Sequence, residues 1–383
     1  MNRSNQLIEI HKSGKPFIIY KSQKGFNLYT DFSKKIILNN KNIKSFLSKK
    51  NKKKSKDVDL FIGFFGYELL NNLIDIKVPK QKNLSFPKGI FYKPEKKIKL
   101  SNNLIYNKEK FGSGSFKINI NRKNYTKIFD KFKKKIKSGE TYQIKICTKY
   151  KTKSRIDPLD FFSRLSKTNL APEAFMIKDN NYSIISCSPE NLITKKGTNI
   201  STKPIAGTVK KTKYLNKKKA LIYFRKNLKE TKEHNMIVDM ERNDLSRICK
   251  AGSVKLSKQK IVEEYKDLFH YVSLIKGKLK KNTKNLDIIK AMMPGGSVIG
   301  CPKINTLNLL NKQEKENRNI YTGSFGYIKF NGDMRFNIII RSILNFKNIS
   351  EISVASGVVV DSNANHEFNE NFIKAKALID LFK

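Results

Sequence analysis

The chain of 383 residues contains no tryptophan, only four cysteines and no long hydrophobic run. The cysteines lie far apart at Cys147, Cys187, Cys249 and Cys301, and none forms a C-x-x-C pair, which argues against a zinc site and a disulfide framework. No segment approaches the roughly 18 consecutive apolar residues of a membrane span. The N-terminal sequence MNRSNQLIEIHKSGK has no apolar segment behind its charges, as a secretory signal would. These absences predict a soluble cytoplasmic protein with reduced, buried thiols.

Acidic residues are scarce, since 32 Asp and Glu stand against 79 Lys and Arg, for a net charge of +47. Such a charge is typical of proteins that bind nucleic acids. However, the lysine runs at 49–54 and 217–219 are scattered among Asn and Ile, as a codon bias towards AT-rich DNA would produce. No zinc-finger spacing, helix-turn-helix or RNA-binding aromatic motif accompanies them. We therefore expect no nucleic-acid partner, and the net charge is the only support for that alternative.

Glycine is also infrequent, at 19 residues, but it is unevenly distributed. Seven glycines fall within 63 residues, where an even distribution would place about three: Gly295, Gly296, Gly300, Gly323, Gly326, Gly332 and Gly357. Glycine is favoured where the backbone needs a positive φ or must approach another group closely. The segment MPGGSVIGCPK at 293–303 is therefore expected to form part of a binding site.

Strand-like and helix-like patterns alternate along the chain, which indicates an α/β or α+β fold. Residues 1–120 are read as strands and loops that form the N-terminal part of the fold, and 121–383 as the catalytic region, together one compact unit. A helix with a C-terminal glycine, Gly139, is expected at 125–137. The other predicted strands are 17–20, 60–67, 142–150, 182–187, 336–344 and 352–360, and the other predicted helices are 214–232, 285–293, 302–314 and 366–382.

Two groups of carboxylates could hold a hard divalent cation, which in proteins typically takes one or two carboxylates. Glu230 and Glu233 lie at the end of a helical pattern, and Glu367 and Glu370 lie in the last predicted helix. In that helix the apolar residues Phe368, Phe372, Ala375, Ile379 and Phe382 form one stripe, and the carboxylates are expected on a different face. The alternative for Glu370 is a solvated ion pair with Lys374, four residues later.

Three further residues combine a reactive side chain with an apolar setting. Glu190 follows directly after a predicted strand, where site residues often lie, although a single glutamate on a turn is commonly only a surface residue. Arg341 lies inside the apolar run IIIRSIL, and a buried arginine needs either an internal carboxylate or a bound one. His270 could line a site or be a hydrogen-bonded core residue.

Nine segments in a fixed order carry a resemblance to a known family. They are SPENLI (188–193), KPIAGT (203–208), EHNMIVDMERNDLSRIC (233–249), FHYVS (269–273), PGGSVIGCPK (294–303), YTGSFGYI (321–328), IIIRS (338–342), SGVVVDS (356–362) and EFNENFIKAKAL (367–378). Together they resemble the chorismate-utilising enzymes, strongly over 125–383 and weakly before that. The resemblance implies an α/β fold in which two orthogonally packed β-sheets lie between layers of helices.

The resemblance also implies roles for residues of this chain. Glu233 and Glu370, with Glu367 assisting, would hold Mg²⁺, and Glu190 would be the general acid that protonates the leaving C4 hydroxyl of chorismate. The remaining positions would bind the substrate and its carboxylates: His270, Gly296, Ser297, Tyr321, Arg341, Gly357 and Lys374.

The nucleophile is assigned from the same resemblance. Family members that use water carry a catalytic lysine where this chain has Gln143, which favours ammonia delivered by a separate glutamine amidotransferase subunit in a heterodimer. Four segments, YQIKICTKY, AGSVK, PGGS and DMRFNIIIRS, are more similar to aminodeoxychorismate synthase component I, which aminates C4. Ala206 stands where many of those enzymes have a catalytic lysine, and it points instead to anthranilate synthase component I, which aminates C2. We expect the first activity and keep the second as the alternative.

Overall fold

A computed structural model describes residues 3–22, 25–48, 56–76, 86–101, 104, 106, 114–169, 171–265 and 268–383. Within these residues the strands form one antiparallel network of 18 strands. The strands are β1 (Phe17–Ser22), β2 (Gly25–Ile37), β3 (Leu60–Phe65), β4 (Gly89–Leu100), β5 (Lys117–Ile118), β6 (Gln143–Lys153), β7 (Glu173–Lys178), β8 (Tyr182–Ser188), β9 (Asn191–Lys196), β10 (Asn199–Lys203), β11 (Ile205–Lys210), β12 (Lys255–Glu264), β13 (Leu268–Lys278), β14 (Gly300–Cys301), β15 (Ser324–Lys329), β16 (Met334–Asn337), β17 (Ser342–Phe346) and β18 (Ile349–Val358).

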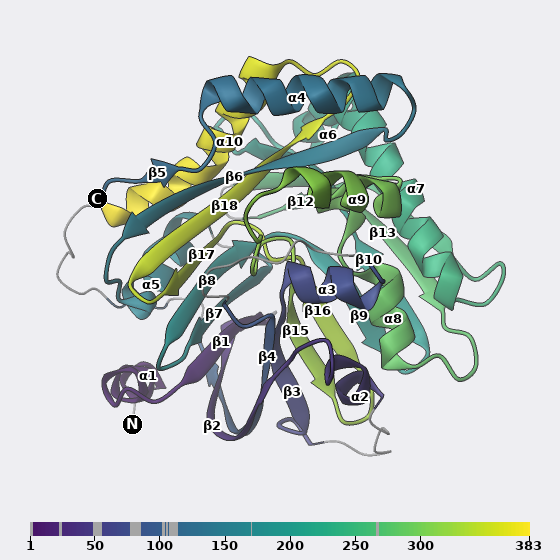
Figure 1. Cartoon of the computed structure of the whole chain (residues 1–383). Helices are drawn as coiled ribbons and strands as arrows, with labels where there is room; N and C mark the ends of the chain where they lie inside the picture. The colour runs from purple at the N-terminus through teal and green to yellow at the C-terminus, as the bar shows by residue number, and fades with distance from the viewer. Residues whose placement is uncertain are drawn as a thin grey trace.

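The network has two arms that are joined through the pairing of β1 with β2. The first arm runs β12–β13–β10–β9–β16–β15–β3–β4–β2, with β11 also beside β13. The second arm runs β1–β7–β8–β17–β18–β6, with β5 and β14 beside β6. The expected α/β class is confirmed, and the two expected sheets correspond to these two arms (Figure 1).

Helices cover the outer faces of both arms (Figure 1). They are α1 (Arg3–Lys12), α2 (Ile43–Leu47), α3 (Tyr67–Leu73), α4 (Arg122–Lys137), α5 (Pro158–Asn169), α6 (Lys217–Lys226), α7 (Leu228–Ile248), α8 (Asn285–Met292), α9 (Lys303–Gln313) and α10 (Ala364–Ile379), with 3₁₀ turns η1 (Gly296–Val298) and η2 (Asp380–Phe382). Helices α4 and α10 lie against β6 and β18 of the second arm, whereas α7 and α8 pack beside the first arm.

Helix α4 shows how local sequence determines an element. The side chain of Asn121 accepts a hydrogen bond from the backbone N–H of Asn124, which satisfies one of the free donors at the helix start. Tyr125, Phe129, Phe132 and Ile136 recur at helical spacing and are all buried. Gly139 follows with φ +76°, a conformation that costs glycine little. The prediction of this helix and its terminal glycine is confirmed.

Two predicted elements are each divided in the structure. The helix expected at 214–232 is α6 followed by α7, because Asn227 adopts an extended conformation and its side chain caps the backbone of Glu230. The strand expected at 336–344 is β16 followed by β17. Between them, residues 338–341 leave the first arm and enter the second, with Arg341 at φ +51°.

Strands of the N-terminal third pair with strands of the remainder. β1 pairs with β7, and β3 pairs with β15. The lysine run at 49–54 lies outside the described residues. The four cysteines are free and buried, as predicted. No helix among the described residues is long and apolar enough to cross a membrane.

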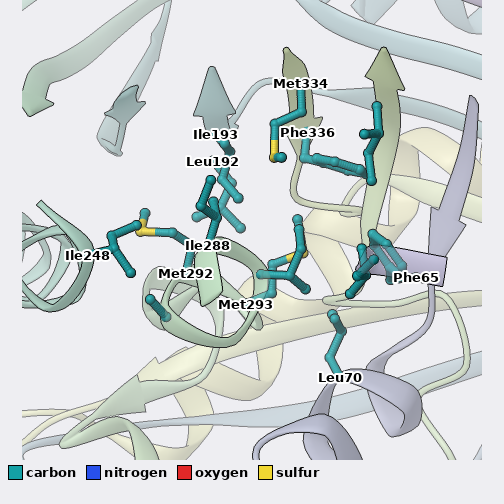
Figure 2. Packing of buried hydrophobic residues seen from close by; sticks show 14 of the residues in the cluster. Phe65, Leu70, Leu192, Ile193, Ile248, Ile288, Met292, Met293, Met334 and Phe336 are labelled. Carbon is teal, nitrogen blue, oxygen red and sulfur yellow. The ribbon is translucent and has the colours of Figure 1, made fainter. Parts of the chain in front are cut away.

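The largest apolar cluster lies between the first arm and helices α7 and α8. Figure 2 shows Leu192 and Ile193 of β9 close to Ile288 and Met292 of α8, and the same cluster includes Phe336 of β16, whose ring centroid lies 5.4 Å from that of Phe65. Met293 is fully buried in the same cluster. This core therefore fixes the start of the glycine-rich segment that follows α8.

Candidate active site

A cavity of about 360 Å³ lies where the chain passes between the two arms. The chain crosses at residues 189–190, between β8 and β9, and crosses back at 338–341, between β16 and β17. Backbone hydrogen bonds hold the crossings together, from Ile338 N to Glu190 O at 3.1 Å and from Cys187 N to Arg341 O at 3.2 Å. The lining residues are Lys145, Pro189, Glu190, Ile205, Thr208, Glu230, Glu233, Ile237, Ser297, Val298, Tyr321, Ile340, Arg341, Ser353, Val354, Ala355, Gly357, Glu367, Glu370 and Lys374.

Glu190 is a buried carboxyl group at the first crossing. Burial raises its pKa to about 7, although a hydrogen bond from Ser297 Oγ at 2.8 Å and the charge of Lys145 both act to lower it. A carboxyl group with such a pKa is partly protonated at neutral pH and can donate a proton. The sequence alone gave no access to this property, because it depends on the burial of the turn.

Arg341 lies at the second crossing and lines the same cavity as Glu190. Its φ of +51° is unusual for a residue other than glycine and indicates a backbone held by its surroundings. Burial lowers the pKa of its guanidinium group, and no carboxylate among the described residues lies within ion-pair distance of it. Of the two partners considered for Arg341, the described part of the chain offers no internal one, which leaves a cation available to a bound carboxylate.

Four glutamates from two helices line the cavity, and Glu230 of α7, one of the residues considered as a metal ligand, is among them. Glu233 belongs to α7, and Glu367 and Glu370 belong to α10. Burial alone would raise the pKa of Glu233, but the charge of Lys145 and hydrogen bonds from Lys145 and Gln143 lower it to about 2. Potential ligand atoms of His366, Glu367 and Glu370 lie within 4.8 Å of one another. Two of these three groups are carboxylates, the oxygen donors that suit a hard cation such as Mg²⁺, and Glu233 is not part of this group.

The face that α10 turns inward agrees only in part with the predicted one. Of the expected apolar stripe, Ala375 and Phe382 are buried and Phe368 and Ile379 pack against apolar clusters, whereas Phe372 is 49% exposed. The prediction is wrong for Phe372, and the carboxylate-bearing face is not turned to solvent, because Glu367 is buried and lines the cavity. The ion pair between Glu370 and Lys374 that was considered as an alternative is present at 2.6 Å, at the mouth of the same cavity.

Lys145 is a cavity residue that the sequence analysis missed. It lies on β6, and its Nζ donates a hydrogen bond to Glu233 Oε1 at 2.8 Å. Gln143 is on the same face of β6 and donates from Nε2 to the same oxygen, also at 2.8 Å. The available signal was weak: Lys145 lies two residues from both Gln143 and Cys147 and so shares their face of the strand, but three further lysines follow in the same strand.

The other predicted residues are divided between the cavity wall and its surroundings. Ser297, Tyr321, Gly357 and Lys374 line the cavity, whereas Gln143, His270 and Gly296 are not among its lining residues. The Nδ1 atom of His270 lies 2.8 Å from Oγ1 of Thr208, which does line it. Burial, followed by the charge of Arg341, lowers the pKa of His270 to about 4, so its imidazole is neutral at pH 7.

Residue 206 occupies an irregular position in β11. The ladder between β11 and β13 shifts register between Ile205 and Gly207, which leaves Ala206 without a direct partner. The side chain of Ala206 lies outside what the structure describes. Lys203, the nearest lysine before it, forms an ion pair with Glu263 at 2.6 Å and does not line the cavity.

The glycine-rich segment needs glycine partly for packing. A Cβ atom at Gly296 would collide with the side chain of Met240 on α7, and one at Gly295 would come within 2.6 Å of Ile338. Gly300 has φ +124°, and a Cβ atom there would collide with the backbone of Gln143. The absence of these side chains lets the segment lie between α7 and β6, where η1 directs Ser297 to Glu190.

Known proteins are similar in sequence to this chain over most of its length. The sequence profile of chorismate binding enzymes matches residues 10–380. Aminodeoxychorismate synthase component 1 of Bacillus subtilis is 35% identical over 267 residues, which are 70% of this chain and 57% of that protein. Anthranilate synthase component 1 of Buchnera aphidicola is 32% identical over 363 residues, covering 83% of this chain and 70% of that one. The chain thus spans little more than half the length of the first of these relatives.

Solved structures of the same fold include anthranilate synthase component I from Streptococcus pneumoniae. It has a TM-score of 0.77 and 24% identity, with 95% of this chain and 90% of that chain covered. A putative isochorismate synthase, DhbC from Bacillus anthracis, has a TM-score of 0.75 and 19% identity, with 99% of each chain covered. At these identities the likeness establishes the fold and does not distinguish between the activities.

Proposed function

Because the chain belongs to the family of chorismate-binding enzymes, we propose that it catalyses the Mg²⁺-dependent amination of chorismate to 4-amino-4-deoxychorismate. The ammonia would come from a glutamine amidotransferase subunit. One observation carries this proposal: three kinds of group line the same cavity. They are the protonatable carboxyl group of Glu190, the guanidinium group of Arg341, which has no carboxylate partner among the described residues, and the carboxylates of Glu233, Glu367 and Glu370. Chorismate has two carboxylates and a hydroxyl leaving group, so it requires these three kinds of group.

The cationic side of the cavity would hold the enolpyruvyl carboxylate. Arg341 can bind a carboxylate through two parallel hydrogen bonds, which is stronger and more specific than a single contact. Tyr321 and Gly357 also line the cavity, and so does Lys374, whose ammonium group is paired with Glu370 at 2.6 Å. Ser297 donates to Glu190 and thereby fixes the carboxyl group relative to the bound substrate.

Glu233 and Glu370, with Glu367 beside them, would hold Mg²⁺ in the same cavity. When bound, the ion neutralises the ring carboxylate and withdraws electron density from the ring. The fit rests on the donor set, since three carboxylates converge on the cavity and the pKa values of Glu233 and Glu370 are both lowered by neighbouring cations against the effect of burial. Both side chains therefore remain anionic at neutral pH.

Glu190 would act as the general acid. A hydroxide ion is a poor leaving group, so proton transfer from the Glu190 carboxyl to the C4 oxygen must accompany cleavage of the C4–O bond. The raised pKa leaves Glu190 partly protonated at neutral pH, so that it can supply the proton with which the oxygen departs as water. Ammonia then bonds to the ring carbon, and the proton that it loses to become the amine returns to the Glu190 carboxylate, which restores the acid.

The assignment of ammonia as nucleophile is supported by what surrounds residue 143. Gln143 offers no base to activate water. Lys145 is close by, but although burial lowers its pKa, the charges of Glu233, Glu370 and Glu367 outweigh that effect and raise it. Its ammonium group therefore also lacks a free lone pair for activating water. Ammonia needs no such base.

Ala206 favours a second candidate function, that of anthranilate synthase component I. This activity would place nitrogen at C2 and release pyruvate, giving an aromatic product. The two activities are separated by incubating the purified chain with chorismate, Mg²⁺ and excess ammonium salt, and identifying the product by mass and fluorescence. An aminated product that retains the enolpyruvyl group is expected. Fluorescent anthranilate with an equal amount of pyruvate would assign the second activity instead.

Replacing Arg341 with glutamine should weaken substrate binding more than it slows the reaction. A charge-assisted, bidentate contact contributes about 1.5–3 kcal/mol, so KM for chorismate should rise roughly 10- to 100-fold while kcat changes much less. Arg155→Gln, at an exposed position outside the cavity, is the matched control. Because no described carboxylate pairs with Arg341, the variant should unfold at a temperature no lower than that of the wild type. An unchanged KM would contradict the assigned role.

A further inference from the structure

Lys145 has no role in the chemistry described above, yet it lies at the centre of the carboxylate group. Its side chain is 13% exposed and that of Glu233 is 24% exposed, so the ion pair between them is largely shielded from water. Glu233 Oε1 accepts hydrogen bonds from Lys145 Nζ and Gln143 Nε2, both at 2.8 Å. Glu233 Oε1, an oxygen that is expected to bind the metal ion, therefore already accepts two hydrogen bonds.

The position of the ammonium group depends on the strand opposite. Gly357 of β18 pairs directly with Lys145 of β6. A Cβ atom at residue 357 would come within 2.6 Å of Lys145 Nζ and 3.0 Å of Gln143 Nε2. Because residue 357 has no side chain, the ammonium group has room above the backbone of Gly357 and can reach Glu233.

The charged groups around Lys145 come from helices α7 and α10 and from the crossing between β8 and β9. Glu233 on α7 is in contact with it, and Glu370 and Glu367 on α10 are close enough to favour its charged form. Lys374, also on α10, pairs with Glu370 at 2.6 Å. Glu190, after β8, is influenced by the charge of Lys145 as well. Lys145 is thus a cation fixed among the carboxylates that would bind Mg²⁺.

We propose that Lys145 is a tethered counter-cation of the Glu233–Glu367–Glu370 cluster, which Mg²⁺ must displace from Glu233 and which lowers the Mg²⁺ affinity of the substrate-free protein. This inference rests on the metal site of the proposed function. Mg²⁺ binds oxygen at about 2.0–2.1 Å and requires close approach to a carboxylate that Lys145 now occupies. The ammonium group and the ion also repel each other at short range.

A functional consequence follows from this competition. A bound substrate carboxylate adds negative charge beside the cluster and offers the displaced ammonium group another partner. Substrate should therefore raise the affinity for Mg²⁺, and by linkage Mg²⁺ should raise the affinity for substrate by the same factor. Lys145 would couple the two binding events and keep the substrate-free site from holding the ion tightly.

The test is calorimetric titration of MgCl₂ into the substrate-free protein. The neutral variants Lys145→Met and Lys145→Gln should each bind Mg²⁺ about tenfold more tightly than the wild type, since a nearby like charge is removed. Lys145→Arg retains the charge and should stay close to the wild type. Lys151→Met is the matched control on the same strand, because Lys151 pairs with Glu316 outside the cavity, and its affinity should be unchanged.

The outcomes separate this inference from the proposal on which it depends. Unchanged or weaker Mg²⁺ binding in both neutral variants would overturn it, because Lys145 would then be holding Glu233 in position for the ion. If neither the wild type nor any variant binds Mg²⁺, the metal site itself is misassigned. Thermal unfolding of each variant shows whether it is folded, and Lys145→Gln keeps a hydrogen-bond donor for Glu233 should the methionine variant fail to fold.

Discussion

Glu233→Gln and Glu370→Gln are each expected to abolish Mg²⁺-dependent turnover of chorismate. Each substitution removes one anionic ligand while it preserves the shape of the side chain. Because a bound metal ion contributes several kcal/mol of charge stabilisation to the transition state, we expect turnover to fall by at least about a hundredfold at saturating chorismate. The measurement is the initial rate as a function of Mg²⁺ concentration.

The two substitutions should have different effects on the neighbouring residues. In Glu233→Gln the ammonium group of Lys145 loses its contact partner, whereas in Glu370→Gln the partner of Lys374 is lost instead. Asp239→Asn is the control on α7, because Asp239 is exposed and pairs only with nearby Arg242 among the described residues. Normal Mg²⁺-dependent rates in either glutamate variant, with the control also normal, would mean that the metal site is misplaced.

Glu190→Gln should reduce kcat by roughly 10²- to 10⁴-fold, the range typical of losing a general acid. Glutamine has the size of glutamate and can still accept a hydrogen bond from Ser297, but it cannot release a proton to the C4 oxygen. The comparison of kcat for the variant and the wild type at pH 7 measures this effect. A variant with a kcat close to that of the wild type would exclude Glu190 as the proton donor.

The pH dependence of the activity provides a second test of the role of Glu190. Glu190 must be protonated to act, and its pKa is about 7, so activity should decline as the pH rises above about 7, by close to tenfold per pH unit. Ser297→Ala removes a hydrogen bond that lowers the pKa of Glu190, and it should therefore move this alkaline decline to higher pH. A decline that stays at the same pH in Ser297→Ala would contradict the assignment.

The stability of the folded protein provides the control for both experiments on Glu190. The pKa of Glu190 is raised in the folded protein from an ordinary value of 4.5, so the folded state binds more protons than the unfolded state between pH 4.5 and 7. The free energy of unfolding should accordingly fall as the pH rises through that range. Glu190→Gln carries no charge, so at pH 8 it should be as stable as the wild type or more stable. Loss of activity in this variant would then not result from unfolding.

Local sequence patterns predicted the helices and strands whose formation depends on residues close to one another in the chain. Helix α4 follows from the spacing of its buried aromatic residues and from the glycine that ends it. The division of 336–344 into β16 and β17 could not be predicted in this way. Residues 338–341 are as apolar as a strand, and only the pairing of β9 with β16 and of β8 with β17 makes the chain turn between them.

The site was predictable where an unusual residue stood out from its surroundings. Arg341 was recognisable because an arginine interrupts an apolar run, and Glu190 because it follows a strand directly. Lys145 was missed because lysine is so abundant in this chain that another lysine in a predicted strand resembled a surface residue. The inward face of α10 was misjudged in part because its carboxylates are stabilised by cations from β6 and by Lys374, contacts that a helical pattern does not contain.

The most direct test of the account is the consumption of chorismate by the purified chain. The protein is incubated with chorismate and ammonium salt in the presence of Mg²⁺, and in parallel with a chelator in place of the ion, and the loss of chorismate is followed by absorbance and mass. We predict Mg²⁺-dependent loss of chorismate that requires ammonium and is absent in Glu190→Gln. If chorismate persists with folded wild-type protein under all of these conditions, the assignment of the cavity as its site of conversion is wrong.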